Sequence, residues 1–202
     1  MSRLYKIQNK IIGITGGIAT GKSSFSKLLQ AEGLNVICAD QLVKKIYLQP
    51  ETLRFIKSIS KQLVSDNKID FKSLRELFFK DRVIKEKVEG HLYPRLKSEF
   101  LNQIKSTTSV IIYDIPLLFE KNLQSKFDSV VLVYASREQQ ILRLCKRDQI
   151  SHSLAENILK HQLPIEKKLD LSDLVIDNSK DKHHLEGEVK KKFLPLYESL
   201  QD

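Results

Sequence analysis

Cysteine is rare in this 202-residue sequence, and tryptophan is absent. The two cysteines, Cys38 and Cys145, lie far apart and fit neither a C-x-x-C motif nor the ligand spacing of a zinc site. Each lies within an apolar stretch, so we interpret both as small buried hydrophobic residues. A disulfide framework is therefore not expected.

Long apolar segments are also missing. No apolar run approaches the ~18–20 residues that a helix needs to cross a bilayer. The basic first ten residues are followed only by a short apolar run at 11–14, which is too short for a signal peptide. The sequence has no internal repeat, low-complexity tract or Gly/Ser-rich linker. These absences predict a soluble, cytoplasmic protein with no membrane partner.

Acidic residues are outnumbered, because 34 lysines and arginines against 25 aspartates and glutamates give a formal net charge of +9. Such a surplus is compatible with a nucleic-acid surface. The lysines are scattered along helical segments, however, and no RNP-like aromatic pattern accompanies them. A basic cleft for polyphosphate ligands and a lysine-rich solvated surface explain the charge equally well. We predict no nucleic-acid partner, and a monomer or small homo-oligomer.

Five short, apolar, β-branched segments alternate with stretches of helical spacing. Strands are expected at residues 11–15, 35–38, 110–113, 130–133 and 174–176. The first two strands and the helix between them form a βαβ unit, which implies a parallel sheet. The predicted fold class is α/β, a doubly wound five-stranded parallel sheet with the fold of a P-loop kinase.

The pattern predicts a single domain over residues 1–202 with three parts. The core covers about 9–48 and 106–202, and a helical insert covers about 50–105. The insert is helical throughout, so no strand is predicted there. A lid is predicted at about 147–165.

Several helix ends carry sequence signals. Gly33 is placed to end the first helix, and Asp70 can cap a helix in the insert. Ser136 begins a capping-box pattern, and Ser153 is predicted to begin a second one. Residues 149–153 between these two helices are predicted to be free of helix.

Residues 16–23 match the phosphate-binding (Walker A) pattern G-x-x-x-x-G-K-[ST] at every required position. Glycines allow positive φ and let backbone N–H groups approach phosphate oxygens. Lys22 can reach the β- and γ-phosphates, and the Ser23 hydroxyl can coordinate Mg²⁺. An apolar strand before the motif and an amphipathic helix after it provide the expected context. The predicted ATP-binding residues are Gly16, Gly17, Ile18, Ala19, Thr20, Gly21, Lys22, Ser23, Ser24 and Arg143.

Two carboxylates follow predicted strands. Asp114, at the end of the third strand, could hold the water shell of the metal, although a carboxylate there is also a common helix cap. Asp40, after the second strand, could accept the proton of an acceptor hydroxyl and align that hydroxyl with the γ-phosphorus. The alternative for Asp40 is the N-cap of a helix beginning near Gln41. The residues alone leave both alternatives open.

Arg143 and Arg147 lie four residues apart, so they share one face of a helix. At the entrance to a lid, two arginines suit the stabilisation of charge on a transferring phosphoryl group. A solvated basic helix end is the alternative. With a phosphate loop elsewhere in the chain, we predict catalytic roles for Arg147 and Lys22.

Other classes of P-loop protein are not predicted. A Ras-type GTPase pairs the loop with switch residues and an N-K-x-D motif that reads the base, and we assign neither here. A motor or helicase usually exceeds this length. The remaining class is a kinase that transfers the γ-phosphoryl group of ATP, with Mg²⁺, to a small hydroxyl-bearing acceptor.

Six blocks of sequence extend the signal of the phosphate loop across the chain. They are the loop itself at 13–24, a D-A-D-like segment at 38–40, an L-R-x-x-x-F-like stretch at 74–79, P-L-L-F-E at 116–120, R-x-x-x-R-D at 143–148 and a Q-x-P … K … V-I-D-N region at 162–178. In this order and spacing, the blocks resemble the dephospho-coenzyme A kinase family over nearly the whole chain.

The resemblance implies transfer of the ATP γ-phosphoryl group to the ribose 3′-hydroxyl of dephospho-coenzyme A, giving ADP and coenzyme A. This reaction is the last step of coenzyme A biosynthesis. The resemblance also implies Mg²⁺ as cofactor and Asp40 as the base. The acceptor-binding residues that it implies are Asp40, Arg75, Tyr93, Pro116, Leu117 and Leu118.

Five positions depart from the pattern of that family. Tyr93 stands where the family usually has histidine, Ile158 where it has arginine, and Cys38 where it has the first aspartate of D-A-D. The usual G-S-G-K reads A-T-G-K at 19–22. We therefore expect the two remaining lid arginines to carry more of the charge of the lid.

Two other functions remain as alternatives. One is a kinase of the same fold that acts on another nucleotide or small molecule. The other is a nucleic-acid-binding ATPase, which would be stimulated by polymer rather than by a small acceptor.

Overall fold

The structure is a computed structural model that describes residues 3–107 and 109–201. The chain forms two compact units. The α/β unit contains Met1–Cys38 and Thr107–Asp202, and the helical unit contains Ala39–Ser106. No helix in the described ranges is both long enough and apolar enough to cross a membrane.

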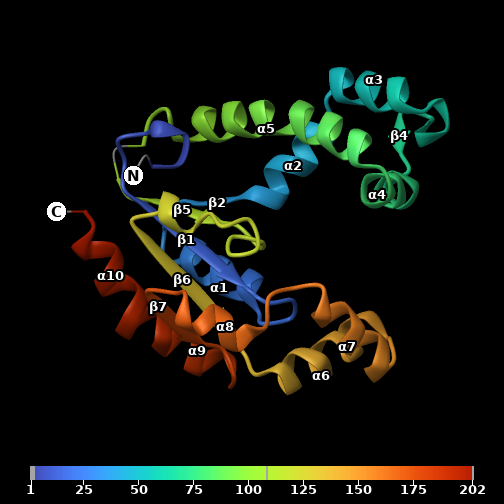
Figure 1. Cartoon of the computed structure of the whole chain (residues 1–202). Helices are drawn as coiled ribbons and strands as arrows, with labels where there is room; N and C mark the ends of the chain where they lie inside the picture. Colours follow the sequence, from blue (N-terminus) through green and yellow to red (C-terminus); the bar gives the residue numbers. More distant parts are fainter. Residues whose placement is uncertain (1–2, 108, 202) are drawn as a thin grey trace. The chain divides into compact units, whose positions relative to one another are not determined.

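The α/β unit is built on one five-stranded sheet in which every pairing is parallel (Figure 1). The predicted fold class is thereby confirmed. The strand order is β2-β5-β1-β6-β7. The strands are β1 (Ile11–Gly16), β2 (Val36–Cys38), β5 (Ile111–Asp114), β6 (Ser129–Tyr134) and β7 (Leu174–Asp177).

The sheet is buried on both faces, which is why its strands read as continuous apolar runs. All six residues of β1 and all four of β5 are buried. The register pairs Ile14 of β1 with Asp114 of β5. The end of β5 therefore lies beside the point where β1 leads into the phosphate loop.

Helices cover both faces of this sheet. Ile12, Ile14 and Ile176 pack on one face with Phe25 and Phe193, whose rings meet edge to face at 5.3 Å. Leu118, Leu132 and Ile165 belong to a second cluster. The helices of the unit are α1 (Lys22–Ala31), α6 (Arg137–Asp148), α7 (His152–Lys160), α8 (Ile165–Asp170), α9 (Lys182–Glu188) and α10 (Leu194–Ser199), with short turns η1 (Leu4–Lys6), η3 (Gln124–Lys126) and a π-helical turn η4 (Val189–Phe193).

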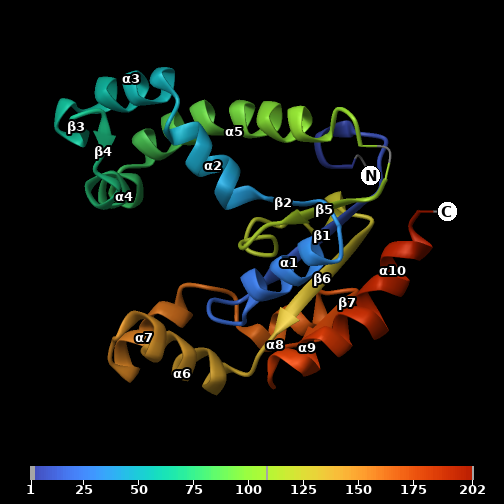
Figure 2. The same cartoon turned by 180° about the vertical axis from the view of Figure 1, so that it is seen from behind.

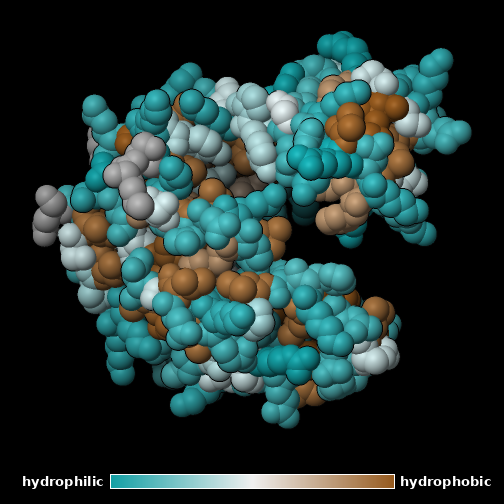
Figure 3. Space-filling model, viewed as in Figure 1, coloured by the Kyte–Doolittle hydropathy of each residue, from teal (hydrophilic) through white to brown (hydrophobic). Residues whose placement is uncertain are grey.

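The helical unit has a smaller core of its own, formed by Ile56, Leu63, Ile69, Leu74 and Val88. Figure 2 shows the hairpin strands of this unit near α3 and α4. Apolar side chains also gather on its surface (Figure 3). Its elements are α2 (Ala39–Tyr47), α3 (Pro50–Ile59), η2 (Lys61–Leu63), β3 (Val64–Ser65), β4 (Lys68–Ile69), α4 (Phe71–Lys80) and α5 (Arg82–Ile104).

The prediction that the insert contains no strand is wrong. β3 and β4 form an antiparallel hairpin, and its two turn residues, Asp66 and Asn67, have φ of 50° and 57°. Positive φ at both turn positions matches the right-handed twist of a two-residue hairpin. Each strand has only two residues, which is too short to interrupt a helical pattern.

The letters N-K-x-D do occur at residues 67–70, although we assigned no such motif from the sequence. Asn67 lies in the hairpin turn, and Asp70 is the N-cap of α4, where it accepts hydrogen bonds from the backbone N–H groups of Lys72 and Ser73. The carboxylate of Asp70 is thus occupied by a helix end, as its predicted cap role requires. This segment is not a base-reading motif.

The other helix-end predictions have mixed outcomes. Gly33, at φ 81°, follows α1 as predicted, and Ser136 forms the predicted capping box with Gln139. The predicted cap at Ser153 is wrong, because Ser151 is the N-cap of α7 and accepts from the N–H of Leu154. Helix therefore resumes at residue 152, inside the stretch that was expected to be helix-free.

The two cysteines are free and half-buried, so the prediction that they are buried is wrong. Cys38 is the last residue of β2, at the edge of the sheet. Cys145 packs at the margin of a small cluster between α6 and α7.

Candidate active site

The phosphate loop connects the buried end of β1 to the first turn of α1. The Thr20 hydroxyl donates to the Gly17 carbonyl at 2.9 Å, which closes the loop on itself. Gly21 is the N-cap of α1 and forms no side-chain cap. Among the described residues, the first N–H groups of α1 therefore have no capping side chain, and a helix end of this kind attracts anions.

Two features require glycine at position 21, namely its backbone conformation and the close approach of the Asn178 side chain. Its φ of 88° lies in the left-handed region, which disfavours residues with a Cβ. A Cβ at this position would also collide with the side-chain amide of Asn178. Ala19 has φ of 61°, so a second residue of the loop adopts the left-handed conformation without being glycine.

Lys22 lies within hydrogen-bonding contact of Asp114, the last residue of β5. The other carboxylate oxygen of Asp114 accepts from the Ser26 hydroxyl at 2.9 Å. Asp114 is only 3% exposed. Two residues expected in the site from the sequence are thus paired here, and Ser23, next to Lys22, is exposed.

Three side chains from the C-terminal half of the chain hold the backbone of the loop. Asn178 donates to the Thr20 carbonyl at 2.7 Å, and Arg143 donates to the same carbonyl at 3.4 Å and to the Asn178 carbonyl at 2.7 Å. Gln162 accepts a hydrogen bond of 2.8 Å from the Ile18 N–H. Sequence reasoning gave no role to Asn178 or Gln162.

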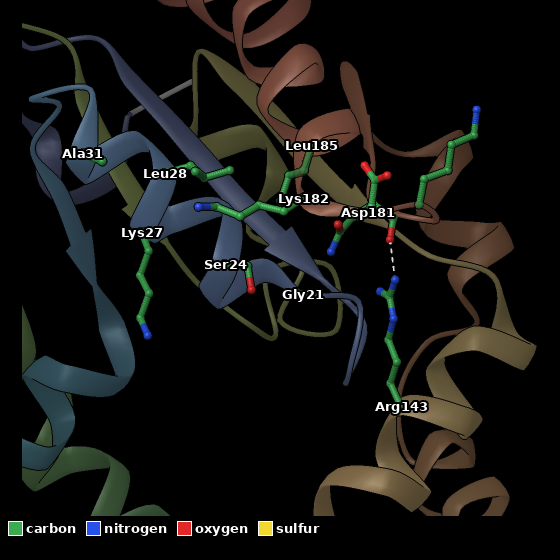
Figure 4. Close-up of a pocket in the computed structure, with 11 residues that line it drawn as sticks. Gly21, Ser24, Lys27, Leu28, Ala31, Arg143, Asp181, Lys182 and Leu185 are labelled. Atoms are coloured by element: carbon green, nitrogen blue, oxygen red, sulfur yellow. Dashed lines mark hydrogen bonds between the residues drawn. The ribbon is translucent and has the colours of Figure 1, made fainter.

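A pocket of about 610 Å³ opens beside the start of α1 (Figure 4). Its walls come from α1, from α6 through Arg143, and from the segment that joins β7 to α9. The lining is apolar at Leu28 and Leu185 and polar at Asn178 and Asp181. A chamber of mixed polarity next to a phosphate loop has the size and chemistry to hold a nucleoside.

Arg147 does not turn toward the loop residues as Arg143 does. Its guanidinium forms two hydrogen bonds, of 2.7 and 2.8 Å, with the adjacent Asp148. This pairing raises the pKa of Arg147 and lowers the pKa of Asp148. Both side chains are exposed, so the pair contributes little to stability.

Two side chains of the P-L-L-F-E segment, those of Leu118 and Phe119, are buried, and the side chain of Leu117 is exposed. Leu118 is fully buried in the cluster with Leu132 and Ile165, so its side chain offers no surface to an acceptor in this structure. Leu117 is 41% exposed, and the Pro116 carbonyl accepts from the Thr15 hydroxyl at 3.2 Å. The expectation that Leu118 contacts the acceptor directly is not supported by this burial.

The predicted acceptor residues of the helical unit are on its surface. Asp40 lies in the first turn of α2, two residues after β2, and is exposed. The helix begins at Ala39 rather than near Gln41, so Asp40 is not its N-cap. Arg75 on α4 is exposed, and Tyr93 on α5 is 50% exposed and donates to Glu89 at 2.9 Å.

Known proteins are similar to this chain in sequence and in fold. The family model described as dephospho-CoA kinase matches residues 10–184. The chain belongs to the dephospho-CoA kinase family. A dephospho-CoA kinase from Fusobacterium nucleatum is 37% identical over 185 residues, which cover 90% of this chain and 95% of that protein.

Two solved structures show the same likeness in three dimensions. A protein from Thermus thermophilus superposes with a TM-score of 0.84 at 25% identity, over 94% of this chain and 98% of that one. A dephospho-CoA kinase from Campylobacter jejuni gives a TM-score of 0.69 at 26% identity, with the same shares covered. As in other kinases, ATP is the co-substrate expected for a member of this family.

The oxygen donors at the loop are suited to the Mg²⁺ that kinase chemistry uses. Mg²⁺ is a hard cation that keeps several waters and takes one or two protein oxygens. The Ser23 hydroxyl and the Asp114 carboxylate are ligands of this type. Among the described residues, no group of three or more His, Cys, Asp or Glu side chains could hold a metal alone, so nucleotide phosphates would have to complete the site.

Proposed function

We propose that this protein transfers the γ-phosphoryl group of ATP to the ribose 3′-hydroxyl of dephospho-CoA, giving ADP and CoA. The observation that carries the proposal is the phosphate loop, whose uncapped helix end and paired Lys22 and Asp114 occur in a chain of the dephospho-CoA kinase family. Loops of this kind bind nucleotide phosphates through backbone N–H groups and a lysine.

On the donor side, the triphosphate would bind to the loop and the nucleoside would bind in the pocket beside α1. Gly21 and Arg143 both line this pocket, and Arg143 also donates to the Thr20 carbonyl. The pocket is therefore continuous with the loop. Residues 16–24 and Arg143 are the ATP-binding residues of this proposal.

Lys22 and Asp114 form an ion pair that nucleotide binding would have to rearrange. Lys22 would turn from Asp114 to the β- and γ-phosphates, while Ser23 would hold Mg²⁺ and Asp114 would hold the water shell of the metal. When bound, the metal neutralises phosphate charge and orients the phosphoryl group for transfer. The pair keeps both charges compensated in a nearly buried place until then, which avoids the cost of an unpaired buried charge.

On the acceptor side, we assign Asp40 as the general base. Its carboxylate is exposed and forms no hydrogen bond or ion pair with other described residues, so it is free to accept a proton. Arg75, Tyr93, Pro116 and Leu117 are the proposed acceptor contacts. Arg147 would leave Asp148 to stabilise charge on the transferring group.

The proposed partners are the two small-molecule substrates, without nucleic acid or membrane. We propose a cytoplasmic protein that acts as a monomer or small homo-oligomer. Binding to RNA or DNA would weaken steeply with salt, and a titration at two salt concentrations checks this point.

An acceptor screen tests the function. ADP release, coupled to a fluorescent readout, should be stimulated by dephospho-CoA and not by adenosine, pantetheine, gluconate or shikimate. Phosphate on the 3′-position should be verified by mass spectrometry of the product. Strong turnover with another acceptor, or stimulation by polynucleotide alone, would reject the proposal.

Asp40→Asn tests the base. Turnover should fall by about 10²-fold or more, the usual scale for a general base, while MgATP affinity stays unchanged because the loop is intact. Asp66→Asn, in the exposed hairpin turn, is the matched control. Turnover of Asp40→Asn at the wild-type rate would remove Asp40 from the mechanism.

A further inference from the structure

Gln162 joins the end of the lid to the phosphate loop. Its side-chain oxygen accepts from the Ile18 N–H at 2.8 Å, although the two residues are 144 positions apart. Gln162 is half-buried and follows the end of α7 by two residues. On the other side of the loop, Asn178 and Arg143 hold the Thr20 carbonyl. The backbone of the loop is thus held at two points, one on each side of Ala19.

The segment that carries Gln162 is itself anchored. The N–H of the next residue, Leu163, donates to Glu120 Oε1 at 3.1 Å. Lys168 Nζ lies 2.7 Å from the same oxygen. Lys168 is fully buried and Glu120 is partly exposed, and within the described chain neither Lys168 Nζ nor Glu120 Oε2 forms a hydrogen bond.

A buried ion pair of this kind is poorly explained by stability alone. Removing both charges from water costs several kcal/mol per ion, and a well-packed apolar pair often stabilises a protein as well or better. The oxygen of Glu120 that faces Lys168 is, however, also the acceptor for the Leu163 N–H. It therefore fixes the register of the segment from which Gln162 reaches the loop.

We propose that Gln162 is a positioning residue for the phosphate loop, and that the buried Lys168–Glu120 pair acts through it. Held at Ile18 and at Thr20, the loop keeps the conformation in which its N–H groups are directed at phosphate. A loop that is already ordered pays less conformational entropy when the nucleotide binds. The inference rests on the proposed function only insofar as the loop binds MgATP.

The first test replaces Gln162 with methionine, which has a similar length but is a poor acceptor for the Ile18 N–H. Loss of one neutral hydrogen bond corresponds to about a three- to tenfold effect. We therefore expect the Kd for MgATP, measured by calorimetry, to rise by about that factor, with KM for the acceptor unchanged. His161→Ala, an exposed neighbour, is the control and should bind as wild type.

The second test asks whether Lys168 and Glu120 act through Gln162. Glu120→Ala with Lys168→Met removes both charges and the acceptor for the Leu163 N–H, so MgATP binding should weaken about three- to tenfold. Glu120→Gln with Lys168→Met keeps an acceptor oxygen at position 120 and should bind close to wild type. Lys167→Met, an exposed neighbour of Lys168 on α8, is the control.

The decisive comparison adds Gln162→Met to the Glu120→Ala, Lys168→Met pair. If the buried pair acts through Gln162, the triple variant should bind MgATP no more weakly than Gln162→Met alone. Effects that multiply, or wild-type affinity in Gln162→Met, would overturn the proposal. The binding assay contains no acceptor, so a failure with dephospho-CoA would refute the proposed function without changing this result.

Discussion

The two compact units of this chain differ in how much of their apolar surface is buried and in how many distant residues hold their functional side chains. In the α/β unit, the strands are buried on both faces, and the loop that would bind phosphate is held by side chains from distant parts of the sequence. In the helical unit, the core is small, and Phe79, Val83 and Phe71 are 76%, 58% and 51% exposed.

This difference separates the proposed ATP-binding residues from Asp40, Arg75 and Tyr93 on the acceptor side, although the proposed acceptor contacts Pro116 and Leu117 belong to the α/β unit. The donor residues Lys22, Asp114 and Arg143 already have partners within the α/β unit, although the proposed reaction requires Lys22 to leave Asp114 when the nucleotide binds. The proposed acceptor residues Asp40 and Arg75 are exposed on their helices. Ligand-binding elements of low local stability are common where a substrate must enter and leave, and the two units divide these properties between them.

Truncating one phenylalanine in each unit should give the largest contrast. Phe25 on α1 is fully buried and packs against Phe193. Phe25→Ala should therefore lower the free energy of unfolding by about 3–5 kcal/mol. Phe79→Ala removes a mostly exposed ring and should cost less than about 0.5 kcal/mol. Urea unfolding followed by circular dichroism measures both.

Kinetics with the acceptor adds a second readout for Phe79→Ala. If Phe79 belongs to the acceptor surface, this variant should raise KM for the acceptor without changing its stability. Equal stability losses for the Phe25 and Phe79 variants would contradict the contrast between the units.

Three glycines sharpen the comparison at a smaller scale. Gly21 and Gly33 both have positive φ, of 88° and 81°, but only Gly21 has a neighbour that a Cβ would strike. Gly33→Ala should cost about 1–2 kcal/mol from backbone strain alone and leave MgATP binding intact. Gly21→Ala should cost more and abolish MgATP binding, because Asn178 and the loop must move apart.

At Gly90, replacement with alanine should increase the stability of the protein instead of lowering it. It lies within α5 of the helical unit, and nothing lies within 4 Å of a Cβ added there. Gly90→Ala should therefore stabilise the protein by about 0.5–1 kcal/mol. Calorimetric melting of the three variants tests this series. If Gly33→Ala also lost MgATP binding, backbone strain alone, without a collision with Asn178, would be enough to abolish binding.

Much of the α/β unit could be predicted from the sequence because its signals are local. Buried parallel strands produce apolar runs, and the phosphate-binding motif is contained in eight consecutive residues. The sheet order needed the structure, but the fold class did not. Asp70 and Ser136 were predictable as caps because the acceptor and its N–H partners are at most three residues apart.

The rest could not be predicted because its signals are not local. The β3–β4 hairpin has only two residues per strand, and this is too few for an alternation of apolar and polar residues to be recognised in the sequence. Ser151 and Ser153 both fit a helix start, and only backbone geometry selects Ser151. Gln162 and Asn178 contact the loop from 144 and 158 residues away, so no spacing in the sequence points to their partners.

The smallest expected effect on stability comes from replacing one carboxylate in each unit. These two variants compare the units through the pH dependence of stability and through MgATP binding. Burial raises the pKa of Asp177, but hydrogen bonds from Ser179 and His184 outweigh it, so the pKa lies below its ordinary value. In the helical unit, hydrogen bonds from the Ser73 side chain and backbone lower the pKa of the exposed Asp70. Both carboxylates therefore bind protons more weakly in the folded state than in the unfolded one.

The sign of the pH effect follows from this difference. Each carboxylate contributes stability above its unfolded pKa of about 4, and this contribution is lost as the pH falls through the lower folded value. Asp177→Asn and Asp70→Asn should each flatten the fall of the urea midpoint between about pH 5 and pH 2. Asp177→Asn should also weaken MgATP binding at pH 7, because the Asp177 carboxylate holds the turn at Ser179, next to Asn178. Asp70→Asn should leave MgATP binding unchanged. If both variants bind MgATP equally, the β7–α9 turn does not support the loop, and the contrast between the units fails at this point.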